Sequence, residues 1–236
     1  LKRVKKINPK IKVLVTGCLA QTSPDKLSKL KNVDFIVDNA NKYLIPKVIK
    51  EPDNYQNEIV SNIFDIKTFD DNYQNLKEDR SRAFLKIQDG CNYRCTFCII
   101  PFARGRSRSM KVSEIIQKIN ELYSLGFNEV VLTGIHLSSY GKDLNITLIE
   151  LLNIIESDTD MPNIRLSSID PADTSIDFID SICESKKICP SFHISLQSAT
   201  DEILKDMKRR YKINIFDDLI KYIRSKIPHA CIGTDV

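Results

Sequence analysis

The chain carries, between residues 90 and 101, the run Gly90-Cys91-Asn92-Tyr93-Arg94-Cys95-Thr96-Phe97-Cys98-Ile99-Ile100-Pro101. Its three cysteines have the spacing C-x3-C-x2-C. Three thiolates on one loop can converge on three corners of an iron–sulfur cubane, and they leave its fourth iron without a protein ligand. Because such clusters are usually held by four cysteines, the missing fourth thiolate indicates a coordination site that is open to a small molecule, as in catalytic metal sites.

A zinc site is the main alternative for the same cysteines. Zinc requires a fourth Cys or His ligand nearby, but the sequence between Asp89 and Met110 has no histidine and no further cysteine. Positive charge near cysteines favours thiolates over thiols. Four arginines flank the loop, namely Arg94, Arg104, Arg106 and Arg108. We therefore expect an iron–sulfur site.

The composition is that of an ordinary soluble protein. The 236 residues are 42% hydrophobic and 28% charged, and this length allows one large domain or one and a half. No run is long enough to span a membrane, and nothing resembles a signal peptide. Seven cysteines, an odd number without regular spacing, argue against a secreted disulfide scaffold. We expect a cytoplasmic protein, whose thiols stay free to bind metal.

The net charge of +4 is unevenly distributed. Residues 80–111 contain eight Lys or Arg and one acid, a charge of +7, so the rest of the chain sums to −3. Basic charge around the cysteine loop suits a polyanionic partner, although a solvated basic surface is the other interpretation. We expect a nucleic acid partner.

The hydrophobic pattern of the first part predicts the end of a small α/β domain over residues 1–50. Strands are expected at 11–16 and 33–37, and a helix at 43–50. Residues 51–81 are acidic, rich in Asn and Asp and without a helical period, which predicts a linker. Because the chain begins at Leu1 and ends on a strand pattern, we expect both ends to lie inside a longer protein.

Strand and helix patterns alternate over residues 82–236. Strands are expected at 83–88, 129–133, 165–168, 192–196 and 230–236, and helices at 112–125, 147–157, 176–185, 201–208 and 214–226. Strands joined by helical crossovers imply an α/β fold with a parallel sheet, open or rolled into a partial barrel. Ligands of such folds gather where the strands end. The cysteine loop follows the first of these strands, so we expect it on the same rim.

The cysteine run resembles the signature of the radical S-adenosylmethionine (SAM) superfamily. The resemblance implies a partial parallel (β/α) barrel in which Cys91, Cys95 and Cys98 hold a [4Fe–4S] cluster. It also implies that SAM chelates the open iron and that an electron from the cluster cleaves SAM to a 5′-deoxyadenosyl radical. An electron donor such as flavodoxin or ferredoxin is then an expected partner.

The whole chain resembles the methylthiotransferases within that superfamily. The run Val15-Thr16-Gly17-Cys18-Leu19-Ala20-Gln21 resembles the last cysteine motif of their amino-terminal domain. The resemblance implies that Cys18 helps to hold an auxiliary [4Fe–4S] cluster, whose other two ligands would precede Leu1.

Further strings are similar to the branch that methylthiolates C2 of N6-threonylcarbamoyladenosine, next to the anticodon of tRNA. They are Pro101-Phe102-Ala103-Arg104-Gly105, Leu132-Thr133-Gly134-Ile135-His136 with Ser139-Tyr140-Gly141-Lys142-Asp143, Leu166-Ser167-Ser168-Ile169-Asp170-Pro171, and His193-Ile194-Ser195-Leu196-Gln197-Ser198. The branches that act on isopentenyladenosine in tRNA and on a ribosomal protein aspartate carry Gln where this chain has His136, and they are the alternatives. Ala199 departs from the Gly that usually follows Gln-Ser. A function of another class, a non-catalytic metal- or RNA-binding module, also stays open.

The resemblance gives roles to individual residues. Phe97 would pack near the adenine of SAM, and SAM would be bound at strand ends by Gly134, His136, Ser168, Gln197 and Asp235. Phosphates of the tRNA anticodon loop would be contacted by Arg104, Arg106, Arg108, Lys208, Arg209 and Arg210. Phe97 and His136 could instead be structural, and the basic residues could be solvated charges. No side chain is given an acid–base role, because an unactivated C–H bond requires a radical cofactor. The remaining cysteines, Cys183, Cys189 and Cys231, are expected to be ordinary thiols.

Overall fold

The computed structural model describes residues 2–69 and 81–236. The chain divides into two units, each of which is described by itself. Unit 1 comprises Leu1–Thr68, Gly90–Asn92 and Cys98–Arg106, and unit 2 comprises Phe69–Asp89, Tyr93–Phe97 and Ser107–Val236. Within the cysteine loop, Gly90–Asn92 and Cys98–Arg106 are assigned to unit 1, and Tyr93–Phe97 are assigned to unit 2.

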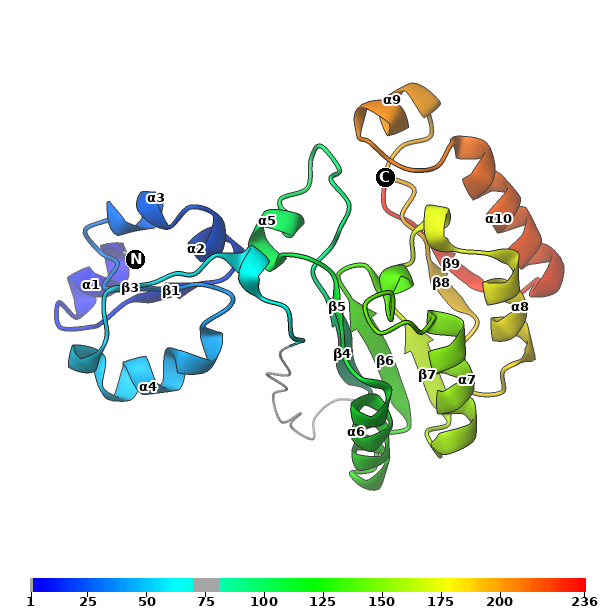
Figure 1. Cartoon of the computed structure of the whole chain (residues 1–236), viewed down its shortest axis with the longest axis horizontal. Coiled ribbons are helices and arrows are strands. Elements are labelled where there is room, and N and C mark those ends of the chain that lie inside the picture. Colours follow the sequence, from blue (N-terminus) through cyan, green and yellow to red (C-terminus); the bar gives the residue numbers. More distant parts are fainter. Residues whose placement is uncertain (1, 70–80) are drawn as a thin grey trace. The chain divides into compact units, whose positions relative to one another are not determined.

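Unit 1 is built on a short parallel sheet in the order β1-β2-β3. Its strands are β1 (Leu14–Thr16), β2 (Phe35–Val37) and β3 (Glu58–Ile59). Its helices are α1 (Lys2–Ile7), α2 (Cys18–Thr22), α3 (Pro24–Ser28), α4 (Ile45–Lys50) and α5 (Ile100–Arg104). Figure 1 shows α3 and α4 on opposite sides of this sheet. Ala20, Leu27 and Ile36 form its buried core, so the prediction of a small α/β unit is confirmed.

The structure differs from the sequence prediction for the linker at residues 51–81. Strand β3 lies within that range and pairs in parallel with β2, and the side chain of Ile63 nearby is 5% exposed. Unit 1 therefore extends through residue 68. The sequence does not indicate these features, because a two-residue strand and one buried isoleucine give no repeating hydrophobic pattern within an acidic, Asn-rich segment. Residues 70–80 of the predicted linker lie outside the described residues.

Unit 2 is built on parallel strands that follow one another through the chain. Strands β4 (Ala83–Asp89), β6 (Glu129–Gly134) and β7 (Asn163–Leu166) pair in parallel, and β8 (Ser191–His193) pairs in parallel with β9 (Cys231–Gly233). Single parallel bridges from Ile164 to Ile188 and from Ile169 to Ile194 connect these two groups. The predicted parallel α/β architecture is confirmed.

One strand of unit 2 was not predicted. β5 (Arg108–Ser109) pairs antiparallel with the end of β4 and forms the outer edge of the sheet. Through β5 the chain re-enters the sheet after the cysteine loop and α5. A strand of two residues leaves no alternating pattern in the sequence, so composition and period could not indicate it.

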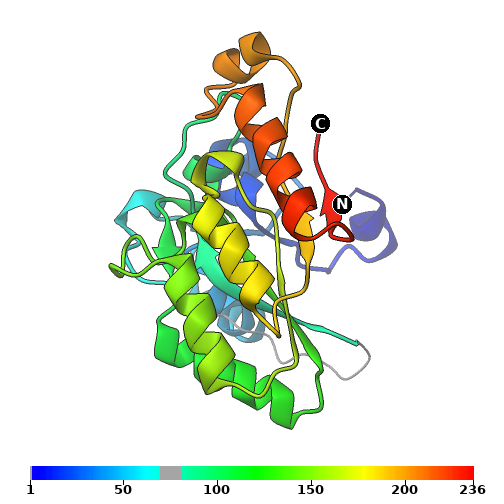
Figure 2. The same cartoon turned by 90° about the vertical axis from the view of Figure 1, so that its right-hand side faces the viewer.

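Helices cover the sheet of unit 2 as the sequence predicts. They are α6 (Val112–Ser124), α7 (Leu148–Asp158), α8 (Ile176–Glu184), α9 (Asp201–Asp206) and α10 (Ile213–Lys226). The predicted stripe of α6 is buried at Ile115, Ile119 and Leu122, and α7 begins with a capping box between Thr147 and Glu150. Figure 2 shows α6, α7, α8 and α10 side by side on the outer face of the sheet. This layer leaves the ends of the parallel strands to the loops that carry the predicted site.

Candidate functional site

The three loop cysteines are half-buried thiols, outside any disulfide, on a segment without helix or strand. Cys91 and Cys98 belong to unit 1, and Cys95 belongs to unit 2. Three thiols can supply three of the four thiolates that usually hold an iron–sulfur cluster, so the chemistry of the residues fits a cluster with one iron left open. Within the described ranges, no three Cys, His, Asp or Glu side chains are gathered at metal-binding distance.

Cys95 has a cationic neighbour that comes from far along the chain. The Nη1 of Arg209 donates a hydrogen bond to the sulfur of Cys95 at 3.6 Å, and its Nη2 contacts Oδ2 of Asp170 at 2.5 Å. The side chains of Arg209 and Asp170 are each 8% exposed. Burial alone would lower the pKa of the Arg209 guanidinium, but Asp170 and Cys95 outweigh it, and the pKa is raised. A positive charge is thus fixed beside the central sulfur of the loop.

The middle of the cysteine loop is also bound to the end of α9. The backbone N–H of Thr96 donates to the carbonyl of Met207 at 3.2 Å, and its hydroxyl donates to the carbonyl of Asp206 at 3.1 Å. Helix α9 ends there because Lys208 has a positive φ of 56°, which turns the backbone and directs Arg209 to the loop. Thr96 therefore satisfies carbonyls that the end of a short helix would leave unpaired.

Asp173, which follows β7, is the centre of a second network around the loop. Its Oδ2 accepts a hydrogen bond from the Tyr93 hydroxyl and lies 3.1 Å from Nε2 of His136, while its Oδ1 lies 3.0 Å from Nζ of Lys142. Burial raises the pKa of this carboxyl, but the hydrogen bonds from His136, Tyr93 and Lys142 outweigh burial and hold the pKa well below its usual range. Burial, and next the bond to Asp173, raise the pKa of Tyr93. Asp173 is therefore a carboxylate and Tyr93 a neutral phenol at ordinary pH.

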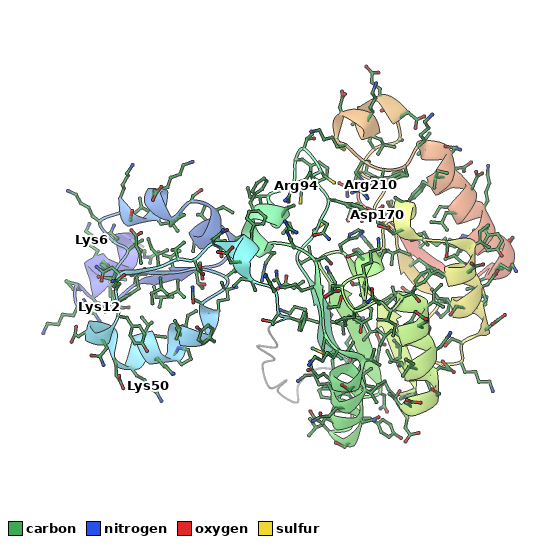
Figure 3. All side chains as sticks on the ribbon, viewed as in Figure 1. Lys6, Lys12, Lys50, Arg94, Asp170 and Arg210 are labelled. Carbon is green, nitrogen blue, oxygen red and sulfur yellow. The ribbon has the colours of Figure 1, made fainter. Side chains whose placement is uncertain are left out.

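Aromatic contacts complete this network. The guanidinium carbon of Arg210 lies 4.0 Å from the centre of the Tyr93 ring, and the rings of Tyr93 and His136 are 4.5 Å apart. Both contacts are within the range of favourable cation–π and ring–ring interactions. Figure 3 labels Arg94, Asp170 and Arg210 in this same part of unit 2. His136 is thus fixed by protein groups on several sides, which favours the structural interpretation of its side chain.

Gly134 ends β6, as the sequence predicts, but the structure gives another reason for a glycine there. A Cβ at this position would lie 2.9 Å from Oε1 of Gln88 and 3.2 Å from Cα of Leu137. Gln88 is completely buried, and its Oε1 accepts the backbone N–H of His136 at 2.8 Å. A glycine is therefore required at position 134 because the Gln88 side chain of the protein itself packs against its backbone.

The other residues predicted to bind SAM lie at strand ends of unit 2. Gln197 has a positive φ of 66°, and its backbone N–H donates to the carbonyl of Asp235 at 2.8 Å. Oδ2 of Asp235 lies 3.0 Å from Nε2 of His193. Ser168 is exposed, and Phe97 is 55% exposed, so Phe97 does not fill the core. These side chains are accessible in the way that a ligand-binding role requires.

Two of the six basic residues predicted to contact RNA have buried side chains. The side chain of Arg108 is 8% exposed and its Nη2 lies 3.7 Å from Asp89, while Arg209 is buried against Asp170. Burial against a carboxylate argues against the predicted phosphate contact of Arg108 and Arg209, because such a guanidinium is screened from solvent. Arg106, Lys208 and Arg210 are exposed, and Arg104 is half-buried.

Cys18 lies in unit 1, at the start of α2, directly after Gly17. The side-chain amide of Asn39 lies 3.8 Å from the Cys18 sulfur and donates to the carbonyl of Ala103 in α5 at 2.7 Å. One amide therefore joins the start of α2 to the helix that follows Cys98.

Sequence reasoning missed Asn39, together with Gln88 and Asp173. Acidic residues after β7 were the one available signal, since Asp170 and Asp173 follow a predicted strand end. Asn39 follows β2, but nothing in its sequence context indicates that its amide reaches α5.

The chain matches the family model described as "Radical SAM superfamily" over residues 85–236. It is 38% identical over 239 residues to threonylcarbamoyladenosine tRNA methylthiotransferase MtaB of Aquifex aeolicus, covering 99% of this chain and 58% of that protein. It is 35% identical to the MtaB protein of Bacillus subtilis and also 35% identical to tRNA-2-methylthio-N(6)-dimethylallyladenosine synthase of Clostridium novyi, in each case over 100% of this chain and 53% of the relative. The chain thus spans little more than half the length of these relatives.

Two solved structures share the fold. The cobalamin-dependent SAM radical enzyme OxsB matches with a TM-score of 0.60 at 10% identity, over 99% of this chain and 37% of that one. The radical SAM methyltransferase TsrM of Kitasatospora setae matches with a TM-score of 0.53 at 19% identity, over 64% of this chain and 29% of that one. At these identities the likeness concerns the fold alone. None of the helices in the described part of the chain has the length and apolar character needed to cross a bilayer.

Proposed function

The chain belongs to the radical SAM superfamily, and from this premise we propose that it is part of a tRNA methylthiotransferase acting at C2 of N6-threonylcarbamoyladenosine. The observation that carries the proposal is the 38% identity over 99% of the chain to an enzyme of that name. Three other relatives with this name are 35% identical over the full chain. The composition of the cysteine loop and its basic surroundings support the same function.

Cys91, Cys95 and Cys98 would hold a [4Fe–4S] cluster, and Cys18 would contribute one ligand to a second cluster. When bound, the first cluster and SAM would supply a carbon-centred radical, which can open the C–H bond at C2 of adenine that acid–base groups cannot. The electron would come from an external donor such as flavodoxin or ferredoxin.

The work of this chain's own residues is binding and orientation. Arg209 and Thr96 hold the middle of the cysteine loop against α9, and Tyr93 and Asp173 hold it against the segment after β7. Ser168, Gln197 and Asp235, at neighbouring strand ends, would bind SAM, as would the exposed ring of Phe97. Arg106, Lys208 and Arg210, all exposed, would contact tRNA phosphates, for which each contact is largely electrostatic.

Isopentenyladenosine in tRNA is the second candidate substrate, favoured by the 35% identity over the full chain to the Clostridium novyi synthase. Mass spectrometry of anticodon-loop nucleosides from cells with and without the gene distinguishes the two. We expect the 2-methylthio form of N6-threonylcarbamoyladenosine to disappear on deletion, while unmethylthiolated N6-threonylcarbamoyladenosine accumulates. Loss of the 2-methylthio form of isopentenyladenosine instead would select the second candidate, and an unchanged nucleoside profile would exclude both.

A further inference from the structure

We propose that Arg209 is a positioning residue for the cysteine loop, which holds the sulfur of Cys95 in place and raises the midpoint potential of the cluster bound there. This inference rests on the proposed function, because it assumes that Cys95 is a cluster ligand. It replaces the RNA contact expected of Arg209 from the sequence. The bond from Nη1 to the Cys95 sulfur, at 3.6 Å, is the contact from which it starts.

The guanidinium is held rigidly enough for such a role. Asp170 fixes its Nη2 at 2.5 Å, and both side chains are 8% exposed. The ring of Tyr211 lies 5.3 Å from the guanidinium carbon. Because water is excluded from the pair, an N–H bond to sulfur is stronger here than on the surface. The planar fork of arginine can reach Asp170 with one nitrogen and Cys95 with another, whereas lysine offers a single point charge.

The Nε–H group of Arg209 is a buried hydrogen-bond donor. Within residues 2–69 and 81–236, the buried Nε–H of Arg209 has no hydrogen-bond partner. Leaving a buried donor unsatisfied costs about 1–3 kcal/mol. Since Nη1 of the same group contacts the Cys95 sulfur, a bound cluster would bring further sulfur acceptors to this guanidinium.

The direction of the effect follows from electrostatics. A one-electron reduction makes the cluster more negative, and a cationic donor at a cluster sulfur stabilises the reduced form more than the oxidised form. Loss of the Arg209 charge should therefore lower the midpoint potential. We expect at least a tenfold shift of the redox equilibrium, which is about 59 mV for a one-electron couple.

The test compares variants of the protein after anaerobic reconstitution with iron and sulfide. Arg209→Met would leave Asp170 as a buried unpaired charge and could unfold the protein, so the deciding variant is the double substitution Arg209→Met with Asp170→Leu. Arg209→Lys keeps the positive charge but removes the planar guanidinium, which contacts Asp170 and Cys95 through two different nitrogens. Lys205→Met, at an exposed position of α9, removes one positive charge from the same helix and serves as the matched control. Circular dichroism checks the fold, iron analysis the cluster, and a mediated titration the midpoint potential.

We expect the double variant to remain folded and either to lose iron or to titrate at a lower potential than the wild type. Arg209→Lys should fall between the two, and Lys205→Met should match the wild type. A folded double variant with full iron and the wild-type potential would overturn the inference. Loss of the fold in the double variant would also overturn the inference, because it would show that Arg209 and Asp170 serve only to stabilise the protein. A wild-type protein that takes up no cluster would instead refute the proposed function, so the two failures can be told apart.

Discussion

The hydroxyl of Tyr93, in the cysteine loop, donates a hydrogen bond to the carboxylate of Asp173, which lies 80 residues further along the chain. The same carboxylate also holds His136 and Lys142. One side chain after β7 therefore fixes a residue between the first two cysteines and a residue that follows β6. This arrangement makes Asp173 a structural centre of the strand-end rim in unit 2.

Asp173→Asn should lower the free energy of unfolding by about 1–3 kcal/mol at neutral pH, because buried donors lose an ionised acceptor. The pKa of Asp173 is depressed in the folded state. Its carboxylate therefore stabilises the protein fully above the unfolded-state pKa of about 3.9. This stabilisation is lost as the pH falls below that value towards the folded-state pKa. Urea unfolding at pH 7 and at pH 3 measures the free energy of unfolding of the wild type and of the variant at each pH. The difference between wild type and variant should shrink at pH 3, and Asp160→Asn, at an exposed position, should have little effect at either pH. An equal difference at both values would contradict an ionised Asp173 bound by three donors.

Gly134→Ala should destabilise the protein by about 1–3 kcal/mol without any ligand, because the new Cβ would lie 2.9 Å from the buried Gln88 side chain. Thermal unfolding in the absence of SAM is the measurement. Gly233→Ala is the matched control at another strand end, where the nearest atom, 3.2 Å away, is in the ring of His193. A Gly134→Ala variant with wild-type stability but weakened SAM binding would return this glycine to the ligand-binding role expected from the sequence.

Replacement of Arg106, Lys208 and Arg210 together by Ser should weaken tRNA binding and reduce the salt dependence by up to about three units of slope, since each phosphate contact releases roughly one counterion. Filter binding across a range of salt concentrations gives the slope. Figure 3 labels three exposed lysines of unit 1, Lys6, Lys12 and Lys50, whose replacement by Ser removes the same charge. Equal losses of slope in the two triple variants would mean that tRNA responds to net charge and does not use the surface proposed.

The sequence predicted those elements whose side chains repeat with a clear period. The buried stripe of α6 and the apolar runs of β4 and β6 are long enough to be recognised, and the structure has them at nearly the expected residues. Strands β3 and β5, of two residues each, are defined only by the partner strand that they meet. No local pattern can indicate such pairings.

The site divides in the same way. The cysteine spacing is local and was read directly, whereas the groups that hold the loop are distant in sequence. Arg209 meets Cys95 across 114 residues and Asp170 across 39. A run of three basic residues at 208–210 therefore suggested an RNA surface, although its middle member is buried between a carboxylate and a thiol. Only the tertiary structure separates Arg209 from its exposed neighbours Lys208 and Arg210.

Release of 5′-deoxyadenosine from SAM under a strong reductant tests the central claim most directly, with iron content measured on the same samples. The wild-type protein should cleave SAM, and Cys91→Ala, Cys95→Ala and Cys98→Ala should each abolish cleavage, because two thiolates cannot hold the cluster in the required geometry. Cys231→Ala, at an exposed cysteine of β9, should retain full cleavage. Wild-type rates in any of the three loop variants would contradict the assignment of this loop as the site of SAM cleavage.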